Sequence, residues 1–277
     1  MKLQGAHAVV VGGSTGVGAA IVRELGARGA RLTVLALPSQ DLDGIAAEVE
    51  GVAQPIDLSD LGQVQGAIGR AEAANGPIDI LICNAATNTS GPFQNLTAEQ
   101  LRRAVTVNML AQMELVRQVL PGMIARGAGT ITTTGSLSTE TSMIHLGTYV
   151  PAKAGLTKFA TDLQSELRDY GIRVFTFILG SVKGTALANA AIEDPVVEFI
   201  EKRAGDLGVL TPDRIAKRVI EVLASDRRSA LITIPPAAAA LVQFRHLTVR
   251  LTDPFMGRSA RKFKRESQTA ARPRSPR

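Results

Sequence analysis

Cysteine is almost missing from this 277-residue sequence, in which Cys83 is the only one. A single thiol cannot form an internal disulfide, which fits a reducing compartment, and we expect a cytoplasmic protein. Tryptophan is absent and aromatic residues make up 4% of the chain, so a core must be built from aliphatic side chains. No apolar run reaches the roughly 18 residues of a membrane-spanning helix, and the N-terminus lacks the features of a signal peptide.

The positive charge is concentrated near the C-terminal end. The chain has a formal net charge of +6, but residues 242–277 alone hold ten Lys or Arg against Asp253 and Glu266, a net of +8. Residues 1–241 therefore sum to −2. We expect them to form a single domain, followed by a basic helix and tail over residues 242–277.

The basic tail has two interpretations. A helix here would place Leu241, Phe244, Leu247 and Leu251 on one stripe, which predicts packing on the body or across a subunit boundary of a homo-oligomer, a dimer or a tetramer. The alternative is an interfacial helix that contacts anionic lipid. No DNA- or RNA-binding motif accompanies the charge, so no specific nucleic-acid partner is expected.

The body alternates between two kinds of segment. Apolar, β-branched runs predict strands at residues 6–12, 31–37, 52–56, 78–83, 129–135, 172–179 and 230–234. Amphipathic stretches predict helices near residues 17–28, 41–50, 60–75, 97–126, 149–169 and 211–225. This alternation indicates an α/β protein with a Rossmann-like, doubly wound parallel sheet of about seven strands and helices on both faces. Residues 186–210 follow the sixth strand as an insertion long enough to act as a lid.

A glycine-rich turn follows the first predicted strand and opens the first helix. Its glycines Gly12, Gly16 and Gly18 are spaced G-x-x-x-G-x-G. Such glycines let the backbone approach a ligand closely, and the helix N-terminus offers free N–H groups to a diphosphate. The alternative is a βα turn that binds nothing.

A tyrosine and a lysine begin another helix. Tyr149 and Lys153 lie on the same stripe as the apolar residues Leu156, Ala160 and Leu163. A lysine on a core-facing stripe needs a partner or a function. Pro151 fits between them in the first turn, where a missing N–H leaves no helical hydrogen bond unmade. Four residues is the helical spacing that places the two polar side chains next to each other.

Other polar residues fall at the carboxyl ends of the predicted strands, where ligands of such sheets bind. Asp57 follows the third strand, Asn84 the fourth, and Ser136 closes the fifth, while Asn108 lies within the helix predicted at 97–126. Each has an ordinary interpretation when taken alone, as a cap, a turn residue or a polar helix position.

Together, these residues make the chain resemble the short-chain dehydrogenase/reductase family over roughly residues 5–235. The family pattern T-G-x-x-x-G-x-G is met at residues 11–18, with Val11 in place of Thr. The N-N-A-G motif is degraded to C-N-A-A at residues 83–86, and the P-G motif after the sixth strand appears as L-G at 179–180. The catalytic set of the family matches Asn108, Ser136, Tyr149 and Lys153.

The resemblance implies an NAD(P)-dependent oxidoreductase. Tyr149 would protonate the carbonyl oxygen, or deprotonate the alcohol, as hydride moves to or from the nicotinamide. Ser136 would hydrogen-bond the substrate oxygen, Lys153 would bind the ribose hydroxyls, and Asn108 would position Lys153 through a water. We also expect the ammonium of Lys153 to lower the pKa of the Tyr149 phenol. No metal site is expected.

The resemblance also implies a set of cofactor-contacting positions. They are Gly12, Ser14, Thr15, Gly16, Val17, Gly18, Ala36, Asp57, Leu58, Asn84, Ala85, Tyr149, Lys153, Gly180, Val182 and Thr185. An acidic residue at the end of the second strand would hold the ribose 2′-hydroxyl of NAD, but Ala36 stands there. Without that carboxylate a 2′-phosphate is not repelled, and Ser39 or Gln40 could donate to it, which favours NADP(H).

Apolar residues near Tyr149 favour a hydrophobic ketone or secondary alcohol as the substrate. They are Met143, Ile144 and Leu146 before the tyrosine and Leu187, Ile192, Val196, Val197, Phe199 and Ile200 in the lid. His145 is expected to be a surface residue without a catalytic role. The alternative function is a Rossmann-like protein that senses or binds a nucleotide and acts through its basic tail. The intact Tyr149–Lys153 pair favours the enzyme.

Overall fold

Seven parallel strands form one sheet in the computed structural model, which describes residues 1–204, 210–228, 230–244 and 258. Their order across the sheet is β3-β2-β1-β4-β5-β6-β7. The strands are β1 (His7–Val11), β2 (Arg31–Ala36), β3 (Val52–Pro55), β4 (Ile80–Cys83), β5 (Gly129–Ser136), β6 (Ile172–Leu179) and β7 (Ala230–Ile234). This order confirms the doubly wound sheet expected from the sequence, with its switch point between β1 and β4.

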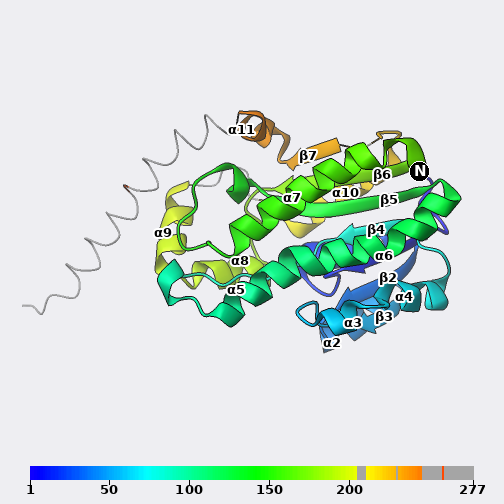
Figure 1. The fold of residues 1–277 in the computed structure, drawn as a ribbon, viewed down its shortest axis with the longest axis horizontal. Coiled ribbons are helices and arrows are strands. Elements are labelled where there is room, and N and C mark those ends of the chain that lie inside the picture. The colour runs from blue at the N-terminus through cyan, green and yellow to red at the C-terminus, as the bar shows by residue number, and fades with distance from the viewer. Residues whose placement is uncertain (205–209, 229, 245–257, 259–277) are drawn as a thin grey trace, which may run out of the picture.

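Helices cover both faces of the sheet, and Figure 1 shows α6 and α7 lying across one of them. The helices that follow the early strands are α1 (Gly16–Gly26), α2 (Gln40–Glu48), α3 (Leu61–Val64) and α4 (Ala67–Asn75). Those in the second half are α5 (Ala98–Val105), α6 (Ala111–Arg126), α7 (Tyr149–Glu166), α8 (Ala186–Ile192), α9 (Pro195–Ala204), α10 (Pro212–Ala224) and α11 (Ala239–Gln243). The helices α5, α8 and α9 gather beyond the carboxyl ends of the strands, at the left of Figure 1.

The central strand β1 explains why the sheet needs two layers of helices. All five of its residues are buried. Ala8 and Val10 belong to one apolar cluster, with side chains of α1 and α10. Val9 and Val11 belong to the other, with side chains of α4, α6 and α7. Since successive side chains of a strand point to opposite faces, both faces must be covered.

Two predicted helices differ from the structure. The helix expected at 60–75 is divided into α3 and α4, because Gly66 between them has a left-handed φ of +71°. The helix expected at 97–126 is continuous, but residues Thr106–Leu110 form a π-helical turn between α5 and α6. A π-turn adds a residue to the local repeat and is frequent at functional sites.

The lid expected at 186–210 consists of α8 and α9, while residues 205–209 lie outside the described part of the chain. In the basic segment, α11 ends at Gln243, and residues 245–257 and 259–277 lie outside the described residues, with most of the stripe expected there. Among the described residues, no helix has the length and apolar character needed to cross a membrane.

Candidate active site

The glycine turn between β1 and α1 brings three backbone segments together. A Cβ atom at Gly18 would lie 1.9 Å from the carbonyl oxygen of Gly12, and one at Gly12 would lie 2.6 Å from Cα of Ala85. Gly12 and Gly16 have φ values of +74° and +56°, which favour glycine. Only glycine therefore fits at positions 12 and 18 without a shift of the main chain.

The N-terminus of α1 is left open by its own side chains. Thr15 occupies the N-cap position but makes no side-chain cap hydrogen bond, and no acidic residue lies in the first turn. The first N–H groups of a helix have no partner within the helix and carry partial positive charge. Together with the close glycine approach, this arrangement fits the diphosphate of a dinucleotide. Ser14, Thr15 and Val17 are the side chains at this opening.

Asn84, directly after β4, ties the glycine turn to the centre of the sheet. Its Nδ2 donates to the carbonyl oxygen of Gly12 at 3.3 Å, and its Oδ1 accepts from Oγ1 of Thr134 on β5 at 3.2 Å. The degraded motif at residues 83–86 thus keeps a structural bridge across β1, β4 and β5.

The carboxyl end of β2 carries no charge of its own. Ala36 is buried, and Ser39 caps α2 by accepting a hydrogen bond from N of Leu42 at 3.2 Å. A capping hydroxyl that accepts at its oxygen keeps its own proton available for a further acceptor. Asp41 and Asp43 lie in the first turn of α2, near the positive end of its dipole, whereas the cap itself is Ser39.

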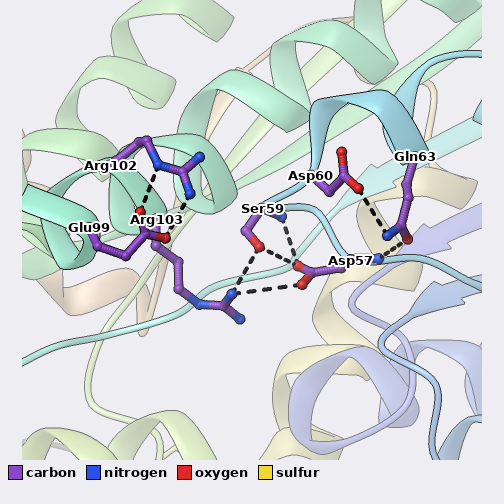
Figure 2. Close-up of polar contacts among 7 residues, drawn as sticks. All are labelled: Asp57, Ser59, Asp60, Gln63, Glu99, Arg102 and Arg103. Carbon is purple, nitrogen blue, oxygen red and sulfur yellow. Dashed lines mark hydrogen bonds and ion pairs between the residues drawn. The ribbon is translucent and has the colours of Figure 1, made fainter.

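Asp57, after β3, is held from two sides (Figure 2). Its Oδ1 accepts from N and Oγ of Ser59 at 2.8 and 2.7 Å. Arg103 of α5 donates to Oγ of Ser59 at 2.9 Å and lies 3.7 Å from Oδ2 of Asp57. Burial raises the pKa of Asp57, but the Ser59 hydrogen bonds and the charge of Arg103 outweigh it and hold that pKa below its ordinary value. Leu58 is buried in the core.

Tyr149 is the first residue of α7, and its hydroxyl is hydrogen-bonded to Ser136 at the end of β5. Ser136 is itself fixed by Ser138. The two Oγ atoms lie 2.8 Å apart, and the N–H of Ser138 donates to Oγ of Ser136 at 3.2 Å. The structure therefore brings together the serine and tyrosine that the sequence places thirteen residues apart.

Lys153 lies one helical turn after Tyr149, with 1% of its surface exposed. Its Nζ donates to the main-chain oxygens of Thr134 at 3.0 Å and Ala85 at 3.4 Å. Burial lowers the pKa of Lys153 from 10.5 to about 8, because an ammonium group loses its hydration. The lysine on the core-facing stripe therefore has partners, and they are backbone carbonyls.

One electrostatic expectation is wrong in direction. The pKa of Tyr149 is raised, because the effect of burial exceeds that of the Ser136 hydrogen bond, which lowers it. Lys153 directs its ammonium toward the carbonyls of Thr134 and Ala85. The phenol is consequently protonated at neutral pH, as a proton donor must be.

Asn108 lies in the π-turn and is completely buried. Its Oδ1 accepts from N of Thr87, and its Nδ2 donates to O of Thr87, both at 2.8 Å. The side chain thus fixes the main chain that follows β4. Both polar atoms of the amide are thus used by Thr87, and the water-mediated link to Lys153 stays a prediction.

Gln112 is a site neighbour that the sequence analysis missed. Its Nε2 donates at 2.9 Å both to O of Val107 in the π-turn and to O of Ala85, the same carbonyl that Lys153 contacts. Its Oε1 is buried without a hydrogen-bond partner. A glutamine on the apolar face that carries Leu115 and Val119 was the available signal.

The segment after β6 returns to the glycine turn. Gly180 donates its N–H to O of Ile234 at 2.9 Å, and Val182 forms an isolated bridge with Leu210. Thr185 caps α8 by accepting from N of Ala188 at 3.2 Å. A Cβ atom at Gly16 would lie 3.3 Å from Cγ2 of Thr185, so the start of the lid lies against the glycine turn.

The apolar residues expected near the substrate divide into two groups. Val196 of α9 packs with Met143 and Ile144 in a small cluster separate from the main core. Leu146 and Val197 are buried, whereas Ile192 is exposed. Leu187 and Phe199 are partly buried, and the side chain of Ile200 lies outside the described part. His145, expected at the surface, is partly buried and lies 3.0 Å from Asp194.

Comparison with known proteins gives a consistent result. A family profile described as "short chain dehydrogenase" matches residues 6–195. The chain is 32% identical over 197 residues to L-xylulose reductase of Bos taurus, covering 70% of this chain and 79% of that protein. It is 29% identical to 3-dehydrosphinganine reductase of Danio rerio, covering 80% and 69%. A crystal structure of a metagenomic short-chain oxidoreductase in complex with NADP is 28% identical, with a TM-score of 0.68, covering 84% of this chain and 99% of that one.

Proposed function

This chain belongs to the short-chain dehydrogenase family, whose members are NAD(P)-dependent oxidoreductases acting on alcohol and carbonyl groups, and from that premise we propose that it interconverts a hydrophobic ketone and its secondary alcohol. The alternative of a nucleotide-sensing protein has no support among these relatives. The observation that carries the proposal is the arrangement of Tyr149, whose hydroxyl interacts with Ser136, and Lys153, which is buried one turn later in the same helix.

The proposed roles follow from what each side chain does in the structure. Tyr149, protonated at neutral pH, donates its hydroxyl proton to the carbonyl oxygen during reduction and takes it back from the alcohol during oxidation. Ser136, fixed by Ser138, donates a hydrogen bond to the same oxygen. Lys153 places positive charge one turn below the phenolate that proton transfer leaves. Asn108 holds the main chain at Thr87 in place beside them.

The cofactor supplies or accepts the hydride when it is bound. The open N-terminus of α1 and the glycines at 12, 16 and 18 would hold its diphosphate, with Asn84 and Thr185 framing the turn. Asp57 would serve the adenine end, and Lys153 the ribose next to the reacting carbon. Gly180 and Val182 would line the nicotinamide side.

We propose NADP(H) as the preferred cofactor. Ala36 presents no carboxylate to a 2′-phosphate, and the hydroxyl proton of Ser39 remains available to donate. The structural relative in complex with NADP supports the same choice. The negative charges of Asp41 and Asp43 in the first turn of α2 would repel a 2′-phosphate. The ratio of kcat/KM with NADPH to kcat/KM with NADH tests which effect is larger.

We propose an apolar carbonyl compound as the substrate, since Met143, Ile144 and Val196 form an apolar cluster close to α7. The similarity to a reductase of 3-dehydrosphinganine is in keeping with this class.

The experiment is a panel of ketones and alcohols with NADPH and NADH, followed by absorbance of the reduced cofactor, for the native protein and Tyr149→Phe. The variant loses the proton donor, so we expect kcat to fall by about 10³-fold or more while the cofactor Kd stays within about three-fold.

Tyr170→Phe is the matched control, because Tyr170 is the other tyrosine of the chain and lies exposed after α7. It should leave kcat unchanged. Turnover near the native rate by Tyr149→Phe would contradict the proposed mechanism, and a higher kcat/KM with NADH would contradict the proposed cofactor preference.

A further inference from the structure

His145 lies where three segments from different parts of the chain meet. It belongs to the loop that leads into Tyr149, and its carbonyl oxygen accepts from N of Gly91 at 2.9 Å, which joins it to the loop after β4. A second hydrogen bond joins the same two loops, since Oγ1 of Thr148 donates to O of Thr89 at 3.3 Å. His145 has a φ of +63°, a left-handed conformation that costs free energy in a residue other than glycine.

The imidazole of His145 reaches the third segment, the lid. Its Nδ1 lies 3.0 Å from both carboxylate oxygens of Asp194, between α8 and α9. The side chains are 21% and 11% exposed, so the contact is largely shielded from water. A shielded hydrogen bond to a carboxylate is stronger than an exposed one.

Asp194 has a second function in the lid. Its Oδ1 accepts from N of Val196 at 2.8 Å and from N of Val197 at 3.1 Å. Since α9 begins at Pro195, these are the second and third residues of the helix, and Asp194 is its N-cap. One carboxylate therefore starts α9 and connects it to His145.

The contact holds an apolar surface in place. Val196, next to the cap, packs with Met143 and Ile144, which directly precede His145. Ser90 adds a parallel link to the lid by donating from Oγ to O of Ala191 at 3.3 Å. Figure 1 shows α8 and α9 beyond the carboxyl ends of the strands, on the side of the sheet where the site lies.

We propose that His145 and Asp194 are positioning residues that clamp the lid to the loop before Tyr149 and so determine affinity for an apolar substrate. The clamp fixes the wall formed by Met143, Ile144 and Val196, which would contact the substrate's apolar body while Tyr149 and Ser136 contact its oxygen. The inference rests on the proposed function and adds to it the part of the molecule that selects the substrate.

Two substitutions separate the clamp from the helix cap. Asp194→Ser keeps a good N-cap but is too short to reach His145. His145→Asn removes the imidazole and tolerates the left-handed backbone. With the best ketone of the panel, we expect each variant to raise KM about ten-fold, the loss of one shielded hydrogen bond, with kcat within about two-fold and the NADPH Kd unchanged. The double variant should be no worse than either single one.

Glu193→Ser is the matched control, because it removes a negative charge from the exposed neighbouring position. It should leave KM unchanged. A rise in KM at unchanged kcat is the expected signature of the clamp. A variant that is merely destabilised would instead show a lower kcat or a lower yield of soluble protein. Additive KM effects in the double variant, or an equal KM effect in Glu193→Ser, would overturn the clamp.

A second measurement needs no substrate. Amide hydrogen exchange of peptides covering residues 186–198 should be faster in Asp194→Ser and in His145→Asn than in the native protein, while α6 exchanges at the native rate. Unchanged exchange in the lid would overturn the clamp even if the enzyme reduces ketones. Faster exchange in a protein that turns over no carbonyl compound would support the clamp and contradict the proposed function.

Discussion

The side-chain amine of Lys153 is titratable and buried, since only 1% of the residue's surface is exposed. Its pKa falls from 10.5 to about 8, so the folded protein releases this proton between about pH 8 and 10.5 while the unfolded chain keeps it. Stability therefore rises with pH across this interval. The buried charge costs most below pH 8, on the order of 3 kcal/mol.

This cost gives a prediction for Lys153→Met, which replaces the ammonium by an apolar chain of similar length. At pH 7 the variant should be inactive, yet its free energy of unfolding should exceed the native value by about 1–3 kcal/mol. The difference should shrink as the pH approaches 10.5. Urea unfolding of both proteins at pH 7 and pH 9.5 measures it, and a variant less stable than the native protein at pH 7 would contradict the argument.

The residues proposed to react could be identified from sequence because their spacing is local. Tyr149 and Lys153 share one helix, and Ser136 ends the preceding strand. The sequence analysis missed the roles of Gln112 and Arg103, because they contact Ala85 and Ser59, which lie in distant segments of the chain. The raised pKa of Tyr149 was missed for a similar reason. It depends on burial and on where the Lys153 ammonium points, which only the packed structure defines.

The break between α3 and α4 is the clearest departure from the expected elements. Gly66 adopts a φ of +71°, while three residues later Gly69 lies inside α4 with open space around it. A periodic apolar pattern continues through the break, since Val64, Ala67, Ile68 and Ala71 are all buried. The pattern alone therefore predicted one helix where the chain makes two.

These two glycines form a matched pair for a prediction. Gly66→Ala should lower the free energy of unfolding by about 1–2 kcal/mol, because a side chain disfavours the left-handed conformation. Gly69→Ala should raise it by about 0.5–1 kcal/mol, because alanine favours a helix interior. Chemical denaturation of both variants tests this. Equal effects of the same sign would mean that the two helices form one continuous element in solution.

The π-turn at Thr106–Leu110 was also beyond the sequence pattern. The π-turn is a wider turn within an otherwise continuous helix, and α6 follows it directly. The apolar pattern of the helix therefore continues through the π-turn without a gap. Asn108 and Gln112 stabilise it from inside, through Thr87 and Val107. Buried amides on an apolar stripe are the only trace that this geometry leaves in the sequence.

At the scale of the whole molecule, alternating apolar runs and amphipathic segments were sufficient to predict the sheet. Crossover helices leave parallel pairing as the consistent solution, and the seven strands fall close to their expected bounds. The arrangement of the lid could not be predicted, because it depends on contacts such as Ser90 with Ala191 that join distant segments.

The separation of charge between body and tail gives a prediction at this scale. Truncation after Phe244 removes a net +8 and leaves a body of −2. All positions proposed for catalysis and cofactor binding precede residue 186, so NADPH binding and kcat should stay within about two-fold of the full chain. If the removed segment packs at a subunit boundary, as the stripe in its sequence predicts, truncation should weaken the oligomer in size-exclusion chromatography.

Vesicle co-sedimentation tests the other interpretation of the tail. Binding of the full chain to anionic vesicles that weakens with salt, together with an unchanged oligomer after truncation, would contradict the packing role. Loss of NADPH binding on truncation would contradict the separation of body and tail.

The pairing of β1 with β4 has a consequence for the newly made chain. Residues 8–11 of β1 pair with residues 80–83 of β4, which come much later in the chain. The pairs β1 with β2 and β2 with β3 join strands that follow one another in sequence. During synthesis the first three strands can associate early, but β1 keeps one unpaired side until β4 has left the ribosome. Ser136, Tyr149 and Lys153 come later still. The emerging protein therefore exposes an apolar strand edge for a time, which is the stage at which we expect it to depend most on chaperones.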